Sequence, residues 1–167
     1  MIPHPASTPV HSPMTARQYG FAFSSLLIAL ALIYHNSWHG GWQYDDNVNI
    51  VENPNVHLHS LTWAGIRRAF SGIDPGNRLD NRPLSYLTFA LNHAAGKLRV
   101  EGYHLVNFSI HVSAAAILFL FILETLRLPV HRGRYHENAY SMALLSVFLW
   151  ALHPIQVTAV TYIVQRM

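Results

Sequence analysis

The sequence predicts an all-α membrane protein with three transmembrane helices and a long outer loop that carries amphipathic interfacial helices. Hydrophobic residues make up 51% of the chain and charged residues only 11%, whereas an average soluble domain has roughly 25% charged residues. Three apolar runs lack Lys, Arg, Asp and Glu, at residues 20–34, 104–123 and 139–152. An α-helix needs roughly 20 such residues to cross the hydrocarbon core of a bilayer. Composition and run length together therefore indicate a chain that crosses a membrane.

Net charge and cysteine content exclude other classes of protein. The chain has a net charge of +3 at pH 7 and a pI near 9.5, but its basic residues are spread out and form no patch interleaved with aromatic residues. No nucleic-acid partner is therefore predicted. The chain has no cysteine, which excludes disulfides, thiolate nucleophiles and cysteine metal sites.

The first span is predicted at about residues 16–38. No formally charged residue lies between Arg17 and Asp45, and a helix of this length extends roughly 30 Å, which is the thickness of the hydrocarbon core. Trp38 would then lie at the far interface. A cleaved signal peptide is the alternative, but the following residues, HNSWHGGW, contain no small-x-small cleavage site. An uncleaved anchor is the favoured interpretation.

The second span is predicted at about residues 104–126 and the third at about 136–153. Polar side chains in the first half of the second run can face partner helices: Asn107, Ser109, His111 and Ser113. The third run is short, and extending it back to about residue 136 brings it near bilayer length. Pro154 is then expected to end or kink that helix.

The orientation follows from the charges of the connecting segments. Residues 127–137 carry three arginines and one acid, whereas residues 35–103 carry six basic and six acidic residues. The positive-inside rule therefore places loop 127–135 in the cytoplasm. The outer loop, residues 39–103, is then on the opposite side. Residues 1–18, which hold four prolines, are predicted to be a disordered cytoplasmic tail.

The outer loop is predicted to be folded, because turn residues alternate with amphipathic segments. Ser60 can cap a helix at Leu61–Phe70. Pro83 can open a second helix at Leu84–Ala95, and Gly96 can stop it. Both helices are expected at the outer membrane interface, although ordinary packing within a loop domain explains them equally well. Three leucines are spaced to bury one side of the second helix: Leu84, Leu87 and Leu91.

Two adjacent carboxylates, Asp45 and Asp46, are the first charges after the first span, in the stretch QYDDNVNI. If the backbone there is extended, neighbouring side chains point to opposite sides, so one can face a cavity while the other fixes the backbone or a basic partner. A partly desolvated carboxylate gains basicity and can take a proton from a hydroxyl. The alternative is a solvated turn in which Asp46 and Asn47 bond to their own backbone.

Twelve histidines raise the question of a divalent metal. His57 and His59 would project to the same side of a strand, His35 and His39 lie one helical turn apart, and Glu52 lies between the two pairs. A divalent metal therefore stays open as a cofactor. No HExxH pattern or clear third ligand is present, so no metal site is predicted.

Other polar residues near the apolar runs are candidates for substrate binding. His104 and His111 on the second span and His153 at the end of the third can line one polar cavity, and structural hydrogen bonding is the alternative for each. Guanidinium groups at a membrane surface bind phosphate bidentately. Salt bridges to nearby aspartates and plain headgroup contact are the alternatives for the three outer arginines: Arg78, Arg82 and Arg166.

Four ordered stretches of the chain carry a resemblance. They read YDDNVNIVENPNV, NRPLSYLTFALNHAAG, GYHLVNFSIHV and ALHPIQVTAVTYIVQRM. Together they resemble the N-terminal part of the transmembrane, tetratricopeptide-repeat-containing O-mannosyltransferase-like proteins of the GT-C glycosyltransferase superfamily, in their bacterial form. The resemblance covers residues 19–167, which would form the N-terminal part of a GT-C transmembrane domain.

The resemblance implies an enzyme that moves a sugar from a polyprenyl-phosphate donor to a hydroxyl of an acceptor protein. Its partners would be the polyprenyl-phosphate sugar, the acceptor protein and membrane lipid. It would lie in the bacterial inner membrane, with the N-terminus cytoplasmic and loop 39–103 periplasmic. The acidic motif of the family falls on Asp45 and Asp46, which are the expected catalytic residues. The expected substrate-binding residues are Arg78, Arg82, His104, His153 and Arg166.

The chain departs from the family pattern in two respects. The family continues with more spans and then tetratricopeptide repeats, whereas no 34-residue repeat is visible here. Animal members tend to carry a Glu shortly after the His-Pro pair, where this chain has Gln156, Val157 and Thr158. The expectation is therefore a fragment that is inactive alone. The alternative function is a non-catalytic membrane scaffold or interaction protein.

Overall fold

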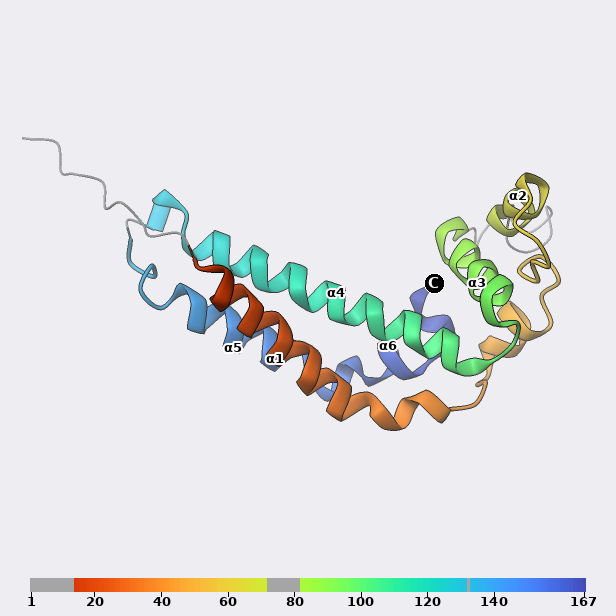
Figure 1. The fold of residues 1–167 in the computed structure, drawn as a ribbon, viewed down its shortest axis with the longest axis horizontal. Coiled ribbons are helices and arrows are strands. Elements are labelled where there is room, and N and C mark those ends of the chain that lie inside the picture. The colour runs from red at the N-terminus through yellow and green to blue at the C-terminus, as the bar shows by residue number, and fades with distance from the viewer. Residues whose placement is uncertain (1–13, 72–81, 132) are drawn as a thin grey trace, which may run out of the picture.

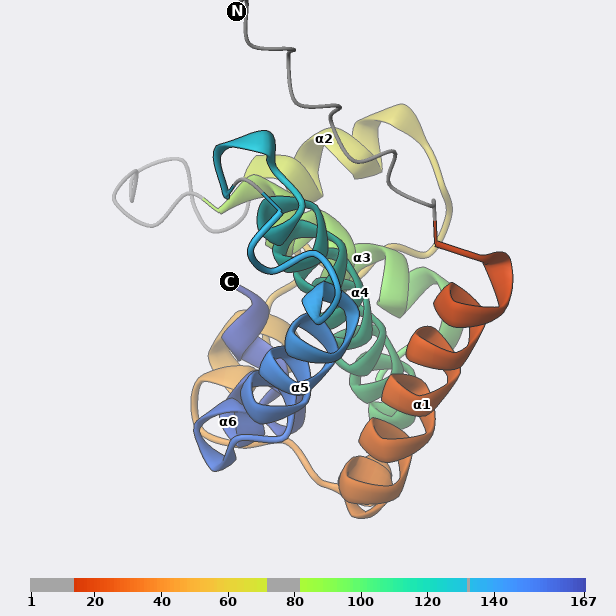
Figure 2. The same ribbon diagram turned by 90° about the vertical axis from the view of Figure 1, so that its left-hand side faces the viewer.

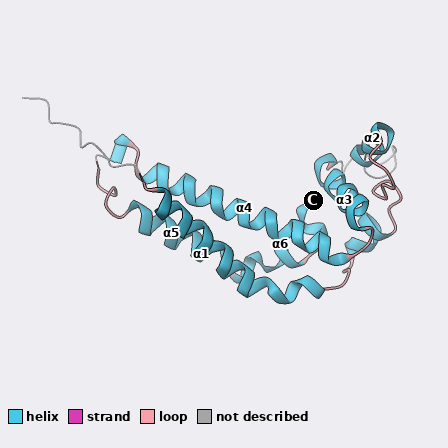
Figure 3. Cartoon of the chain, in the orientation of Figure 1, coloured by secondary structure: helices cyan, strands magenta, loops and turns pink. Residues whose placement is uncertain are grey.

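A computed structural model of the chain describes residues 14–71, 82–131 and 133–167. Over these ranges the chain is helical and contains no strand (Figure 3), which confirms the predicted all-α class. Three of the described helices lie side by side as a bundle (Figures 1 and 2): α1 (Ala16–Tyr34), α4 (Val100–Leu126) and α5 (Ala139–Ala151).

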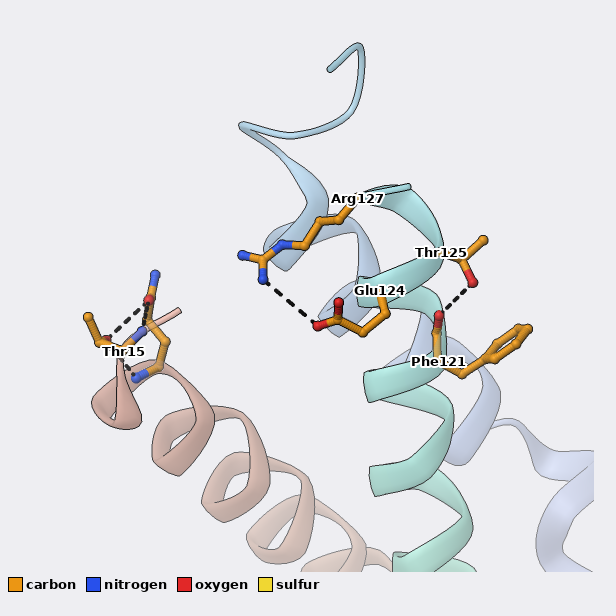
Figure 4. Close-up of polar contacts among 6 residues, drawn as sticks. Thr15, Phe121, Glu124, Thr125 and Arg127 are labelled. Carbon is orange, nitrogen blue, oxygen red and sulfur yellow. Dashed lines mark hydrogen bonds and ion pairs between the residues drawn. The ribbon is translucent and has the colours of Figure 1, made fainter. Parts of the chain in front are cut away.

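The start of α1 is fixed by a capping box. The Thr15 hydroxyl accepts a hydrogen bond from the Gln18 N–H at 3.3 Å, and the Thr15 N–H donates to Gln18 Oε1 at 2.9 Å (Figure 4). Two of the unpaired groups at a helix N-terminus are thereby satisfied. The helix thus includes the last residues of segment 1–18, while residues 1–13 of that segment lie outside the described residues.

Within the ranges that the structure describes, two helices are long and apolar enough to cross a membrane, and they indicate association with a membrane. They are Ala16–His39, in which α1 continues as the 3-10 helix η1 (His35–His39), and Val100–Leu126. The second begins four residues before the predicted start at residue 104. Both agree with the predicted spans.

The predicted third span corresponds to two helices with a break between them. Helix α5 ends at Ala151, and after the short 3-10 helix η5 (Pro154–Gln156) the chain continues as α6 (Val157–Thr161). The two parts are bent by 55°. Pro154 cannot donate a backbone hydrogen bond and restricts its own φ, so the break falls where the sequence placed a kink. The pair forms one span only if it crosses as a broken helix.

The bundle packs through small residues. Because alanine side chains are short, α4 and α5 can approach closely, which gives more van der Waals contact. The outward faces of the long helices carry large exposed apolar residues, as expected of surfaces in contact with lipid, such as Phe21, Ile28, Leu32, Ile117 and Phe121. The fully buried alanines of the bundle core are Ala22, Ala115, Ala139, Ala143 and Ala151.

A second core lies at one end of the bundle and contains the two helices predicted in the outer loop. Helix α2 (Trp63–Ser71) begins two residues after the expected start, and α3 (Pro83–Gly96) is one residue longer at each end than expected. They pack with the π-helix η2 (Asn47–Val51) and the 3-10 helix η6 (Ile163–Arg166). The buried side chains of this second core, which also come from α4 and from the loop after η2, are Ile50, Val56, Leu58, Ala69, Tyr86, Phe89, Ala90, Tyr103 and Ile163.

The predicted buried face of α3 is wrong. Leu84 is 69% exposed and Leu91 is 46% exposed, whereas the buried face consists of Tyr86, Phe89, Ala90 and His93. A polar contact favours burial of this face in addition to apolar packing, because the Tyr86 hydroxyl donates to Asn49 Oδ1 at 3.0 Å. A face with hydrogen-bond partners in the preceding loop is buried in preference to a face of leucines alone.

The two ends of the bundle differ. The start of α1 and the connection between α4 and α5 lie at one end, where Arg127 and Glu124 form an ion pair at 3.9 Å (Figures 1 and 4). Helices α2, α3 and the C-terminal residues gather toward the other end (Figure 1). The start of α1 and the described residues of loop 127–135 therefore lie on the same side of the bundle, in agreement with the predicted order of the spans.

Candidate functional site

The acidic pair lies in a short helical segment and not in extended backbone. Tyr44 has φ = 36° and turns the chain into a helical stretch that begins at Asp45 and continues into η2. The Asp46 N–H donates to the Gln43 carbonyl at 2.8 Å, which closes the first turn. The condition of an extended backbone, on which the opposite directions of the two carboxylates were argued, is therefore not met. Neighbouring side chains on a helix diverge by about 100°, so the two carboxylates still face different surroundings.

The Asp46 carboxylate accepts hydrogen bonds from two backbone N–H groups, one three residues away and the other near the end of the sequence. The side chain is only 1% exposed. Its Oδ2 accepts from the Gln43 N–H at 2.9 Å, and its Oδ1 accepts from the Val164 N–H at 2.8 Å. The second bond joins residues 118 positions apart. We call this pair of bonds the Asp46 clamp.

Burial raises the pKa of Asp46 above its ordinary value. The two backbone hydrogen bonds and the positive potential of His104 act in the opposite direction, because they favour the ionised carboxylate. Both acceptor oxygens are already used by the clamp. Asp46 is thus enclosed, and its main interactions are structural.

Asp45 presents its carboxylate to solvent. The residue is exposed, while its backbone is held from two directions. Its N–H donates to the Tyr162 phenol oxygen at 3.2 Å, and its carbonyl accepts from Asn49 Nδ2 at 2.9 Å. The sequence could not distinguish the two acids, whereas the structure makes Asp45 the accessible carboxylate.

Residues 162–166, which we call the C-terminal hook, bring the acidic segment together with α3 and α4. Asn107 Nδ2 on α4 donates to the carbonyls of Tyr162 at 3.1 Å and Ile163 at 3.3 Å. The Ser85 hydroxyl on α3 donates to the carbonyl of Arg166 at 2.9 Å. Sequence reasoning noted Asn107 only as a polar residue in a span and missed Tyr162, because contacts between distant segments leave no local pattern.

Arg166 lies between aromatic rings in the second core. Its guanidinium carbon is 4.2 Å from the Phe89 ring centroid and 5.7 Å from that of Tyr103, within the range of cation–π attraction. Nη2 donates to Asn92 Oδ1 at 2.7 Å, while Nε and Nη1 are buried without a hydrogen-bond partner. Burial lowers the pKa of Arg166 to about 9, so the group remains a cation at neutral pH.

The other predicted substrate-binding residues occupy different positions. His104 is buried, with Nε2 3.1 Å from the Gly40 carbonyl oxygen and Nδ1 without a partner. His153 is exposed, and its Nδ1 accepts from the Ile155 N–H as a local cap. Arg82 is exposed at the start of α3, and Arg78 lies outside the described residues.

The three histidines expected along one polar cavity make separate contacts. His111 Nε2 bonds the Ala151 carbonyl at 3.0 Å, whereas His104 bonds the loop before the acidic pair and His153 caps its own helix. Electrostatic interaction links Asp46 with His104 and with Arg166. The group that the structure brings together therefore contains Asp45, Asp46, His104 and Arg166.

A histidine cluster, His57, His59 and His93, holds the segment after η2 against α3. The His57 and His93 rings stack at 4.5 Å, and the His59 ring meets His93 edge-on at 5.7 Å. His93 Nδ1 donates to the Leu58 carbonyl at 3.0 Å, and His57 Nε2 donates to the Ile50 carbonyl at 2.9 Å. The strand considered for this segment is absent, since the described backbone there forms turns and loop. No group of three His, Cys, Asp or Glu in the described ranges could hold a metal ion.

Comparison with known proteins finds similarity to one group of relatives. The chain is 35% identical to Protein O-mannosyl-transferase Tmtc1 of Drosophila melanogaster over 142 residues, which is 83% of this chain and 15% of that protein. It is 28% identical to Protein O-mannosyl-transferase TMTC3 of Mus musculus over 144 residues, 84% of this chain and 14% of that protein. It is 29% identical to Protein O-mannosyl-transferase F38B6.6 of Caenorhabditis elegans over 157 residues, 90% of this chain and 21% of that protein.

The chain thus spans between 14% and 21% of the lengths of these relatives. No family model matches the chain, and no solved structure matches it. The expected resemblance to O-mannosyltransferase-like proteins is confirmed at this level. The relatives compared are eukaryotic, so the finer assignment to the bacterial form of the family stays a prediction.

The Asp46 clamp predicts a large difference between the two acids. Asp46→Asn replaces one acceptor oxygen with an NH₂ group, so one buried backbone N–H loses its partner. We expect a loss of about 1–3 kcal/mol in the free energy of unfolding, measured by denaturation in detergent micelles. Asp45→Asn is the matched control and should change the free energy by less than about 0.5 kcal/mol. Equal stability of the two variants would show that the clamp contributes nothing.

The histidine cluster predicts lower stability in mild acid. Burial lowers the pKa of His93 below 6.5, and His57, Lys97 and His59 act in the same direction. The unfolded chain therefore binds more protons than the folded chain, so stability is lost as pH falls through 6.5 and is fully present above it. Unfolding midpoints at pH about 5.5 and about 7.5 measure the slope. His93→Gln should flatten it, whereas His39→Gln, at an exposed position outside the cluster, should not.

Proposed function

We propose that this chain is the acid-bearing part of a membrane glycosyltransferase that moves a sugar, mannose by analogy with its relatives, from a polyprenyl-phosphate donor to a hydroxyl of an acceptor protein. The observation that carries the proposal is the exposed Asp45 carboxylate, whose backbone is held by Tyr162 and whose neighbour Asp46 is committed to the clamp. The names of the relatives, which are protein O-mannosyl-transferases, support the reaction class.

In the proposed reaction Asp45 is the general base. It takes the proton of the acceptor hydroxyl while that oxygen forms a bond to the anomeric carbon of the sugar. The bond between the anomeric carbon and the phosphate oxygen breaks, and the lipid phosphate leaves with the electron pair. Direct displacement of this kind inverts the anomeric centre. Asp46 would act indirectly, because its clamp fixes the turn from which Asp45 projects.

The leaving phosphate needs positive charge nearby. Arg166 is the best placed of the described candidates, because Nε and Nη1 have no hydrogen-bond partner and the charge is retained at neutral pH. Arg82, Arg78, His104 and His153 stay proposed contacts to the substrate. Of these, His104 is the one whose charge acts on Asp46.

We place the chain in a membrane with the acidic pair on the non-cytoplasmic side, which is the periplasm for a bacterial inner membrane. The bent pair α5 and α6 then forms the third span of the N-terminal part of a GT-C domain. Helices α2 and α3 would lie at the outer interface. In α2, Trp63, Arg67 and Phe70 follow one stripe of the helix, and Trp63 is 74% exposed, as suits a headgroup layer.

The proposed activity belongs to a larger protein. The described helices offer two candidate spans, or three if the bent pair is one span, and the relatives are several times longer than this chain. We propose that the chain alone binds but does not transfer the sugar. Activity therefore has to be measured in membranes that contain the complete reading frame in which this chain lies.

Asp45→Asn tests the proposed base. Loss of a general base lowers rates by about 10²–10⁴-fold, so transfer of radiolabelled mannose to acceptor protein should fall by this factor. Glu52→Gln, at an exposed carboxylate in the same loop, is the control and should retain the rate. An unchanged rate in a folded Asp45→Asn protein removes Asp45 as the base, and undetectable donor binding would favour a non-catalytic scaffold.

Cysteine labelling tests the orientation. The chain has no cysteine, so single variants Asp45→Cys and Arg134→Cys give unambiguous signals. A membrane-impermeant maleimide added to intact cells or spheroplasts should label position 45 and should label position 134 only after the membrane is opened. The reverse pattern would place the acidic pair in the cytoplasm and end the proposal.

A further inference from the structure

The phenol of Tyr162 lies beside the accessible carboxylate and has a proton to donate. Tyr162 is the residue between α6 and η6, and its phenol oxygen accepts the Asp45 N–H at 3.2 Å. A hydroxyl carries one O–H donor and two acceptor lone pairs. The oxygen is the acceptor in this bond, and its own O–H faces the Asp45 carboxylate as a donor, so a bound hydroxyl would come between the two groups.

The phenol stays protonated under physiological conditions. Partial burial raises the pKa of Tyr162 above its ordinary value of 10.0, and the negative charges of Asp45 and Asp46 act in the same direction. At neutral pH the phenol is therefore uncharged and can donate a hydrogen bond. Asp45 supplies a carboxylate, which accepts hydrogen bonds only when ionised.

We propose that Asp45 and Tyr162 form a two-point site for an alcohol hydroxyl, which donates its proton to the Asp45 carboxylate and accepts a hydrogen bond from the Tyr162 phenol. The inference rests on the proposed function and deepens it, because it assigns the group that holds the hydroxyl oxygen while the base takes the proton. Tyr162 contacts the substrate in this arrangement.

The chemistry of the pair selects a hydroxyl over other ligands. A phosphate or carboxylate would be repelled by Asp45. An ammonium would pair with Asp45, but it has no lone pair to accept the phenol O–H. An alcohol has one donor and two lone pairs, so it satisfies both groups at once. The hydroxyl can belong to a Ser or Thr of the acceptor protein or to the sugar.

The surrounding contacts hold the two groups in register. Asn107 donates to the carbonyls of Tyr162 and Ile163, and the Asp46 clamp binds the N–H of Val164, two residues after Tyr162. The segments that carry Tyr162 and Asp45 are therefore fixed relative to each other. Preorganisation of this kind lowers the cost of binding a small ligand group.

Tyr162→Phe tests the site, because it removes the O–H and keeps the ring. The hydrogen bond is worth about 0.5–1.5 kcal/mol net, so the KM for the substrate that provides the hydroxyl should rise by about 2- to 12-fold. A rise for an acceptor peptide assigns the site to Ser or Thr, and a rise for the polyprenyl-phosphate mannose assigns it to the sugar. Tyr44→Phe, at a tyrosine that is 87% exposed beside the same acids, is the matched control. No rise in either KM, or an equal rise in the control, overturns the proposal.

A second measurement does not depend on transfer. The full 167-residue chain in lipid nanodiscs is labelled with ¹⁵N and titrated separately with N-acetyl-serine methylamide, N-acetyl-alanine methylamide and methyl α-mannoside. The serine probe or the mannoside should shift the Asp45 amide resonance, the alanine probe should not, and Tyr162→Phe should remove the difference. An unchanged Val164 amide in the variant shows that the clamp is intact.

The two measurements separate this inference from the proposed function. If no variant transfers mannose but the hydroxyl probes still act through Tyr162, the transferase proposal fails and the hydroxyl site stands. If transfer depends on Asp45 while hydroxyl and alanine probes behave alike and Tyr162→Phe leaves both KM values unchanged, the base stands and the hydroxyl site fails.

Discussion

The Asp46 clamp is the interaction on which the rest of the site depends. A buried carboxylate is costly unless hydrogen bonds replace its hydration, and here both oxygens accept backbone N–H groups. The clamp closes the turn after the first long helix and ties that turn to the C-terminal hook. As a result, Asp45 is directed to solvent and Tyr162 is brought beside it.

The molecule joins two kinds of packing. The bundle of α1, α4 and α5 is held by apolar contacts among buried alanines and larger side chains such as Leu26 and Phe119. The second core also contains polar contacts: Ser85 and Asn107 donate hydrogen bonds to carbonyls of the hook, and Arg166 donates one to Asn92. Loop and hook therefore form one unit at the end of the bundle, and the chemistry proposed for the chain lies on that unit.

Three ionisable groups of this unit, Arg166, Asp46 and His104, are not arranged as direct ion pairs in the described contacts. Arg166 is stacked on aromatic rings with two donors unpartnered, and Asp46 and His104 influence each other without a direct ion pair in the described contacts. A buried cation with free donors is energetically unfavourable by itself. An anionic ligand such as a lipid phosphate would relieve that cost, which is why Arg166 is preferred over the exposed Arg82 in the proposed function.

The sequence by itself determined the elements, and the tertiary structure decided the site. Run length and charge identified α1 and α4, Pro83 and Gly96 marked the ends of α3, and Pro154 marked the break after α5, because each of these effects is local. The buried face of α3 was predicted wrongly, and the sequence left the backbone at Asp45 open, since both depend on contacts with other segments. The roles of Asp46 and Tyr162 were likewise hidden, because their partners Val164 and Asp45 are 118 and 117 residues away. Contacts between residues so far apart leave no periodicity or spacing that can be recognised in a single sequence.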